Sequence, residues 1–186
     1  MSYYSIEMEN EPKATMKAPD VLGLYDMLQK LGIQIWINGG WGVDALLGKE
    51  TRIHNDLDIA IEQKDIPRFR ALLEAHGYRE IKLDIAMPHN YVLGDDKGHE
   101  VDVHVIVLDD QGNGIYGPAA SGEMYPAASL TGSGTIDGQE VKCISPEWAI
   151  KFHSGYELKA KDFEDVSALC EKFGIELPAE YERKKK

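Results

Sequence analysis

The sequence is poor in cysteine and has no long apolar run. Its two cysteines, Cys143 and Cys170, stand in unrelated contexts without metal-ligand spacing, so we expect two buried thiols. No stretch approaches the roughly 20 apolar residues that cross a bilayer. The first residues lack a basic segment followed by an apolar core, which is not typical of a secretory signal. We therefore expect a cytoplasmic protein with no membrane partner.

Positive charge is also scarce. The 186 residues contain 20 lysines and arginines against 32 acidic side chains, which gives a formal net charge of -12. Sequence-independent nucleic-acid binding needs clustered basic residues, so we expect no nucleic-acid partner. An acidic protein can still bind a nucleotide when metal ions bridge the charges, and it attracts small cationic molecules.

Hydrophobic periodicity predicts an α/β domain in which helices and strands alternate. Helices are expected over residues 18–32, 41–48, 65–77, 145–156 and 160–174, and strands over residues 33–37, 57–62 and 78–84. Residues 90–109 predict a hairpin whose turn contains Asp96, Lys97 and Gly98. Its second strand is largely apolar on both faces, so we expect it in the centre of the sheet. In this strand Val101, Val103, Val105 and Val107 alternate with Asp102, His104 and Ile106. Residues 109–138 predict a long surface loop leading into a short hairpin.

Three aspartates occupy strand positions at which a sheet can bring them together. Asp56 and Asp58 are two residues apart, so both point to one face of their strand, while Asp102 is the one acid within a valine-rich strand. Three buried carboxylates are costly unless they lie at an exposed edge or a divalent cation neutralises them. Mg²⁺ suits oxygen ligands, and two such ions about 4 Å apart can serve a displacement at phosphorus. The alternative makes Asp56 a turn residue and Asp102 a charge on an edge strand.

Gly39 and Gly40 stand between a predicted strand and the start of a helix. Free backbone N–H groups and the helix dipole make such a helix start an anion site. The alternative is that the two glycines only satisfy the steric demand of a sharp turn. Together with the aspartates on the next strand, the pair favours a phosphate-binding role.

These motifs resemble the nucleotidyltransferase superfamily that includes DNA polymerase beta-like enzymes. The stretch "INGGWGVDALLGKETRIHNDLDIAI", with "VDVHVI" and "ISPEWAIKFHSGYELKAKDFEDV", is more similar to LinA-like lincosamide nucleotidyltransferases and aminoglycoside 2''-adenylyltransferases. The resemblance spans about Val21 to Phe173. It implies a mixed, mostly antiparallel sheet of about five strands flanked by helices, with a nucleotidyltransferase core at 18–142, a C-terminal helical segment at 143–178, and flexible ends at 1–17 and 179–186.

The resemblance also implies roles for the acids and glycines. Asp56 and Asp58 match the paired metal ligands of the family. Asp102 matches the third carboxylate, which is expected to take the proton of the attacking hydroxyl. Gly39 and Gly40 match the turn that holds the triphosphate of the nucleotide. The expected cofactors are therefore Mg²⁺, as two ions, with ATP or another nucleoside triphosphate as co-substrate.

Four further positions have an implied or open role. Arg52 matches a basic residue near the phosphates, where it would stabilise the pyrophosphate leaving group, with a surface salt bridge as the alternative. His54 either lies near the phosphates or bonds to the backbone and orients Asp56. Lys151 resembles a C-terminal lysine that reaches the phosphates. Asp44 either caps a loop or pairs with Arg52.

Aromatic residues divide between core and pocket. Core or pocket wall is expected for Trp36, Trp41 and Trp148, and an acceptor pocket for Tyr116, Tyr125 and Tyr156.

The sequence thus predicts a nucleotidyltransferase that moves AMP from Mg-ATP to a hydroxyl of a small cationic antibiotic, a lincosamide or an aminoglycoside, and so causes resistance. Two alternatives stay open. One is an adenylyltransferase that modifies a protein hydroxyl in a toxin–antitoxin-like system. The other is a nucleotide-binding module without catalysis. The acceptor, the nucleotide preference, the role of residues 109–138 and the pairing of two chains in a homodimer are also left open.

Overall fold

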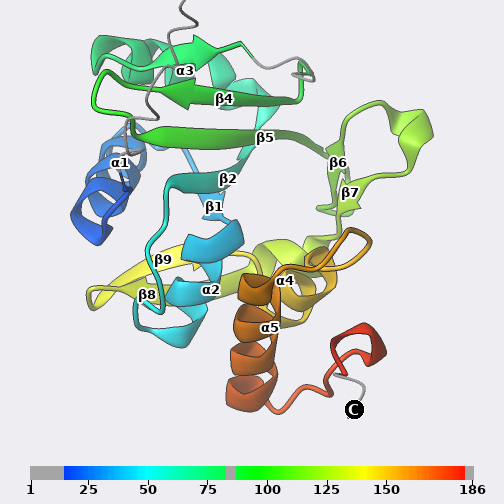
Figure 1. Ribbon diagram of the computed structural model, residues 1–186. Helices are drawn as coiled ribbons and strands as arrows, with labels where there is room; N and C mark the ends of the chain where they lie inside the picture. The colour runs from blue at the N-terminus through cyan, green and yellow to red at the C-terminus, as the bar shows by residue number, and fades with distance from the viewer. Residues whose placement is uncertain (1–14, 83–86, 183–186) are drawn as a thin grey trace, which may run out of the picture.

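The computed structural model describes residues 15–82 and 87–182, which form a mixed sheet flanked by helices (Figure 1). The strands are β1 Ile35–Ile37, β2 Asp56–Glu62, β3 Arg79–Ile81, β4 Asn90–Gly94, β5 Glu100–Leu108, β6 Gly114–Tyr116, β7 Met124–Tyr125, β8 Gly132–Ile136 and β9 Gln139–Cys143. The α-helices are α1 Ala18–Lys30, α2 Gly39–Leu47, α3 Ile66–Ala75, α4 Pro146–Phe152 and α5 Ala160–Phe173, and four 3₁₀ turns are η1 Gln63–Asp65, η2 Ala119–Ser121, η3 Ala127–Thr131 and η4 Ala179–Tyr181.

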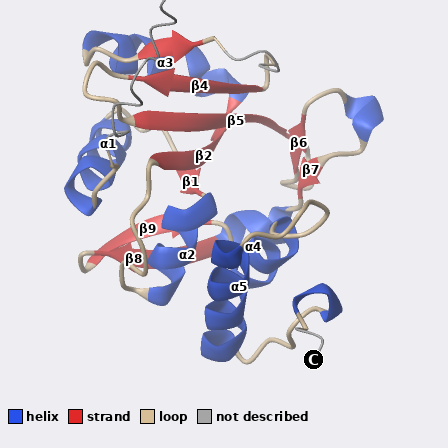
Figure 2. Cartoon of the chain, in the orientation of Figure 1, coloured by secondary structure: helices blue, strands red, loops and turns tan. Residues whose placement is uncertain are grey.

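The sheet runs in the order β3-β4-β5-β2-β1-β9-β8, and the short β6 and β7 continue from the end of β5 (Figure 2). The pairs β2–β5 and β1–β9 are parallel, and the other pairs are antiparallel. A mixed, mostly antiparallel sheet is therefore confirmed. It has nine strands in the described residues rather than about five, because several strands of two or three residues are too short to show a hydrophobic period.

The faces of β2 and β5 explain how this sheet presents its acids. Leu57, Ile59, Val101 and Val103 are fully buried on one face. The helix α3 covers this face at β4, where the Arg70 guanidinium lies 4.0 Å from the centre of the Tyr91 ring. The other face of β2 and β5 carries the acids, and the beginning of α2 approaches it. The helices α2, α4 and α5 pack against one another beside this face (Figure 1).

The β4–β5 hairpin forms with its predicted turn, because the Asp95 carboxylate accepts hydrogen bonds from the backbone N–H groups of Lys97 and His99. The predicted alternation along β5 fails at its end. Ile106 is buried, whereas Val107 is 49% exposed. The physical reason is that β5 there runs past β4, and the Val107 side chain lines an open cavity beside α3 instead of packing under that helix.

Residues 109–138 contain more regular structure than a surface loop. They include β6, β7, two 3₁₀ turns and β8, which forms the predicted hairpin with β9 just after this range. That hairpin turns at Asp137 and Gly138, both with positive φ, as an Asp-Gly turn requires. Among the described residues no helix is long and apolar enough to cross a membrane.

The described residues near the two chain ends pack against the rest of the protein, and both cysteines are buried. Residues 1–14 and 183–186 of the predicted flexible ends lie outside the described residues. Within the described part, Met16 is buried and its N–H donates to the His54 carbonyl, and Tyr181 is buried as well, so neither residue behaves as a free end. Both cysteines are buried and free, as expected.

Candidate active site

Three carboxylates meet on neighbouring strands. The parallel β2 and β5 place Asp58 directly opposite Asp102, and Asp56 precedes Asp58 on the same face. Burial raises the pKa of Asp58 to about 7, with a further increase from Asp56 and Asp102. Burial and then the charge of Asp56 raise the pKa of Asp102 to about 6. The protein thus brings together acids that repel each other, and a cation between them would relieve that repulsion.

The donor atoms fit a divalent cation. Carboxylate oxygens of Asp58 and Asp102 and a ring nitrogen of His104 lie within 4.8 Å of one another. The Oδ1 atom of Asp102 is buried and has no hydrogen-bond partner among the described residues. Such an unpaired buried oxygen is costly unless a ligand or cation satisfies it. Oxygen-rich donor sets suit Mg²⁺, so the residues present fit the ion that the sequence predicts.

Gly39 and Gly40 form the start of α2, where Gly39 lies against Asp58 and Gly40 lies against His54 and Arg52. Gly39 has a φ of +54°, a conformation that side chains disfavour, and a Cβ on it would lie 2.7 Å from Cγ of Asp58. A Cβ on Gly40 would lie 2.6 Å from a guanidinium nitrogen of Arg52. Only glycine therefore lets the backbone of the helix start approach both the acids and Arg52. The free N–H groups of this turn make it suited to a phosphate.

A cleft of about 240 Å³ opens over this turn. Its lining combines Asp56 and Asp58, but not Asp102, with the two glycines and two cations: Asn38, Gly39, Gly40, Arg52, His54, Asp56, Asp58, Phe152, His153, Tyr156, Lys161 and Asp162. Phe152, Tyr156 and His153 supply an aromatic wall from α4 and the segment after it. The cleft thus offers an anion site, a cation site and a flat apolar surface side by side.

Arg52 is held by the C-terminal helix. Its guanidinium donates a hydrogen bond of 3.0 Å to the carboxylate of Asp165 on α5, which is buried. Arg52 itself remains 24% exposed toward the cleft. It therefore makes an ion pair, as the alternative interpretation predicted, but the pair is partly buried and fixes the guanidinium beside the glycine turn.

His54 and Asp44 form a buried pair. The Nε2 atom of His54 lies 2.5 Å from the Asp44 carboxylate, which also accepts hydrogen bonds from the N–H and hydroxyl groups of Thr51. Asp44 thus caps the loop between α2 and β2 and does not pair with Arg52. The His54 side chain is bonded to Asp44 and not to Asp56, so it positions this loop against α2.

Lys161, and not the predicted Lys151, lines the cleft. Lys151 is exposed, and its ammonium lies 4.2 Å from the centre of the Trp148 ring, outside the cleft lining. Lys161, in the first turn of α5, lines the cleft and lowers the pKa of Asp58. The sequence analysis missed Lys161. One available signal was the position of this lysine in the first turn of the predicted helix, where the helix dipole disfavours a cation.

An aromatic cluster lies beside Asp102, around His104. It includes Tyr116 and Tyr125, two of the three tyrosines predicted to line an acceptor pocket, whereas Tyr156 lines the cleft over the glycine turn. His104 stacks on Tyr116 with ring centres 5.3 Å apart. Burial, followed by the nearby His89, lowers the pKa of His104 to about 4, so the ring is neutral near pH 7. The tryptophans Trp36 and Trp41 belong to the core, and Trp148 is partly buried against it.

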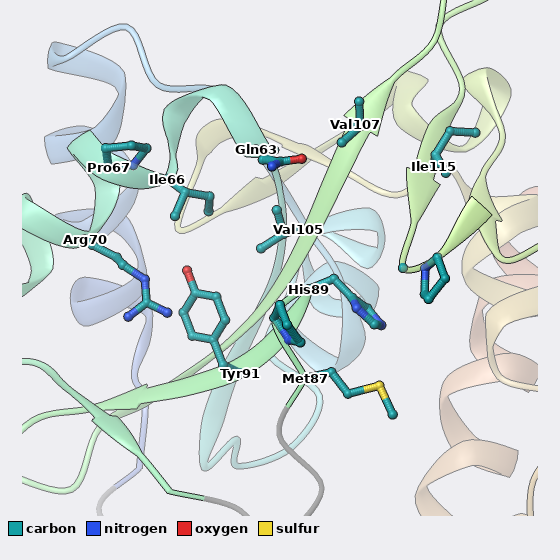
Figure 3. A pocket seen from close by; sticks show the side chains of 13 residues that line it. Gln63, Ile66, Pro67, Arg70, Met87, His89, Tyr91, Val105, Val107 and Ile115 are labelled. Carbon is teal, nitrogen blue, oxygen red and sulfur yellow. The ribbon is translucent and has the colours of Figure 1, made fainter. Parts of the chain in front are cut away.

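A separate cavity of about 770 Å³, larger than this cleft, lies between α3 and the strands β4, β5 and β6 (Figure 3). Its walls are mainly apolar and include Ile66, Met87, Val105 and Val107. None of the three aspartates lines it. The chemistry of the smaller cleft, not cavity size, therefore identifies the candidate active site.

Comparison with known proteins agrees with this geometry. The family profile described as aminoglycoside-2''-adenylyltransferase matches residues 20–169. A lincosamide resistance protein of Staphylococcus haemolyticus is 30% identical over 147 residues, which cover 78% of this chain and 89% of the relative. A 2''-aminoglycoside nucleotidyltransferase of Escherichia coli is 38% identical over only 47 residues, covering 25% of this chain and 27% of the relative.

Solved structures show the same fold. The lincomycin-bound lincosamide antibiotic adenylyltransferase LnuA matches with a TM-score of 0.73 and 28% identity, over 84% of this chain and 98% of that chain. The complex of ANT(2'')-Ia with adenylyl-2''-tobramycin matches with a TM-score of 0.68 and 22% identity, over 84% of this chain and 89% of that chain. The nucleotidyltransferase fold that the motifs implied is therefore confirmed.

Proposed function

Because the chain belongs to the aminoglycoside-2''-adenylyltransferase family of nucleotidyltransferases, we propose that it transfers AMP from Mg-ATP to a hydroxyl group of a lincosamide and thereby causes resistance. The observation that carries this proposal is the in-register pair of Asp58 and Asp102, with Asp56 beside them and the Gly39–Gly40 helix start against them. Since the donor is ATP, we also propose that the protein acts in the cytoplasm, without a nucleic-acid partner.

Asp56, Asp58 and Asp102 would hold the divalent cations. When bound, Mg²⁺ neutralises the charge on the phosphates and on the attacking and leaving oxygens. The Gly39 and Gly40 region of α2 presents N–H groups to the triphosphate.

Arg52 and Lys161 are far apart in the sequence but line the same cleft, where both would stabilise the pyrophosphate as it departs. Asp165 keeps Arg52 in this place.

The transfer itself forms one P–O bond and breaks another. The acceptor hydroxyl oxygen bonds to the α-phosphorus, the bond from that phosphorus to the pyrophosphate oxygen breaks, and the hydroxyl proton passes to Asp102. In the metal-free protein, burial and the charge of Asp56 raise the pKa of Asp102 to about 6, so the carboxylate is still largely ionised near pH 7 and can accept a proton.

Two observations favour a lincosamide over an aminoglycoside as the acceptor. The similarity to the lincosamide resistance protein extends over most of both chains, whereas the similarity to the aminoglycoside enzyme covers 47 residues. The acceptor side of Asp102 is also formed by neutral aromatic side chains, His104, Tyr116 and Tyr125. An aminoglycoside is the second candidate, supported by the family match and by the net charge of -12.

Pyrophosphate release tests the proposal. Purified protein is incubated with Mg²⁺, each of the four ribonucleoside triphosphates, and a panel of lincosamides and aminoglycosides. We expect release with ATP and a lincosamide, and its loss in Asp102→Asn but not in Asp96→Asn, a matched control in the exposed turn of the same hairpin. Mg²⁺-dependent ATP binding without release in any mixture would reject the antibiotic acceptor and favour a protein hydroxyl. Absence of ATP binding would reject the transferase altogether.

A further inference from the structure

One carboxylate oxygen of Asp102 lies near His104, but beyond hydrogen-bond distance from it. The buried Oδ1 lacks a hydrogen-bond partner among the described residues, and Nε2 of His104 lies 3.6 Å from it. Nitrogen and oxygen atoms in a hydrogen bond are about 2.7–3.2 Å apart. A shift of less than about 1 Å would therefore give Asp102 its missing partner.

The other ring nitrogen of His104 is already engaged. Its Nδ1 lies 2.8 Å from the Tyr125 hydroxyl, and that hydroxyl accepts a hydrogen bond of 3.4 Å from the side-chain amide of Asn38. A phenol has one proton, and among the hydrogen bonds of the described residues Nδ1 is the one acceptor for it, so the short 2.8 Å contact directs the Tyr125 proton to Nδ1. A neutral imidazole with Nδ1 as acceptor carries its own proton on Nε2, which is the nitrogen that faces Asp102.

Packing fixes this chain of donors. His104 stacks on Tyr116, and the Tyr125 ring makes edge contacts with Tyr116 at 5.8 Å and with Phe152 at 5.1 Å. At the far end, Asn38 precedes α2 and lines the nucleotide-side cleft. The series of hydrogen-bonding side chains Asn38, Tyr125 and His104 therefore runs from the cleft over the glycine turn to Asp102, the proposed base.

We propose that Tyr125 and His104 are positioning residues, which orient Asp102 by directing the Nε2–H of His104 at its Oδ1 and leave Oδ2 for the divalent cation and the acceptor hydroxyl. This inference rests on the proposed function, in which Asp102 takes the hydroxyl proton. A different role, with Nε2 of His104 as a nitrogen ligand of the metal ion, needs the opposite tautomer, because a ligating nitrogen carries no proton.

The tautomer can be measured without any substrate. Long-range ¹H–¹⁵N correlation spectra of the full-length protein, assigned by comparison with His104→Gln, report which ring nitrogen carries the proton. We expect the Nε2–H form with and without Mg²⁺, and loss of this preference in Tyr125→Phe. An Nδ1–H form, or direct coupling of Nε2 to Mn²⁺ in pulsed electron paramagnetic resonance, would overturn the proposal and make His104 a metal ligand.

Kinetics provide the second test. In Tyr125→Phe, which removes one oxygen and keeps the ring, we expect kcat to fall roughly 10- to 100-fold, as for other outer-shell partners, with KM for ATP unchanged. Tyr25→Phe is the matched control, because Tyr25 is also a buried phenol and accepts a hydrogen bond from the Lys142 N–H outside the site. Equal kcat values in the two variants, or a loss confined to KM, would refute positioning. If the parent enzyme turns over no acceptor, the proposed function fails, and the tautomer alone decides the orientation of His104.

Discussion

The approach of α2 to Asp58 gives the sharpest prediction about the site. In Gly39→Ala, the new Cβ would lie 2.7 Å from Cγ and 3.1 Å from Cβ of Asp58. Carbon atoms pack at about 3.5–4.0 Å, so the Asp58 carboxylate must move by roughly 1 Å. A misplacement of this size costs on the order of 100-fold in rate. We therefore expect kcat for pyrophosphate release to fall roughly 100-fold.

A matched control separates this clash from backbone strain. Gly32 also has a positive φ, +67°, but a Cβ there meets nothing within 4 Å in the described structure. Gly32→Ala and Gly39→Ala should each lose about 1–2 kcal/mol of stability from the left-handed conformation, or roughly 2–8 °C in Tm, and only Gly39→Ala should lose activity. Thermal melting and kcat are measured on both variants. Parental kcat in Gly39→Ala, or an equal loss in Gly32→Ala, would refute the placement of Asp58 at the reacting centre.

Three further predictions concern charge. In metal-free buffer the Asp58 carboxyl keeps its proton up to about pH 7 in the folded protein but loses it near pH 3.8 in the unfolded chain. Tm should therefore fall as the pH rises between these values, and Asp58→Asn should flatten this part of the plot of Tm against pH. An unchanged plot in Asp58→Asn would contradict the raised pKa. Asp44→Ala leaves His54 buried without its partner and should cost about 3 kcal/mol, seen as a Tm lower by roughly 6–12 °C; a change within 1 °C would refute the buried pair. Lys161→Ala should raise KM for ATP roughly 10-fold, the loss of about one charge-assisted contact, and more than Lys151→Ala does; the reverse order would restore the role first predicted for Lys151.

The features that depend on local sequence could be predicted. The two-residue period of a strand places Asp56 and Asp58 on one face, and the Gly39–Gly40 pair marks the helix start, so the acids and the anion site were expected before the structure was known. The β4–β5 and β8–β9 hairpins were expected for the same reason, because their turns carry Asp-Lys-Gly and Asp-Gly.

The features that depend on contacts between residues far apart in the sequence could not be predicted. Arg52 donates a hydrogen bond to Asp165, which lies 113 positions later in the sequence. Lys161 lines the cleft because α5 packs on α2. Val107 continues the apolar alternation of the sequence but is exposed, because β5 there has run past the end of β4. The boundary proposed near residue 142, between a core and a C-terminal helical segment, remains a prediction.

The most direct measurement of the central account is the mass of the acceptor after reaction. Lincomycin incubated with ATP, Mg²⁺ and the protein should gain one adenylyl group, detected by mass spectrometry, and the same mixture with Asp102→Asn should leave it unmodified. Adenylylated lincomycin in the Asp102→Asn mixture at the parental rate would contradict the role of Asp102. Unmodified lincomycin with the parent protein, although ATP binds in the presence of Mg²⁺, would contradict the proposed acceptor.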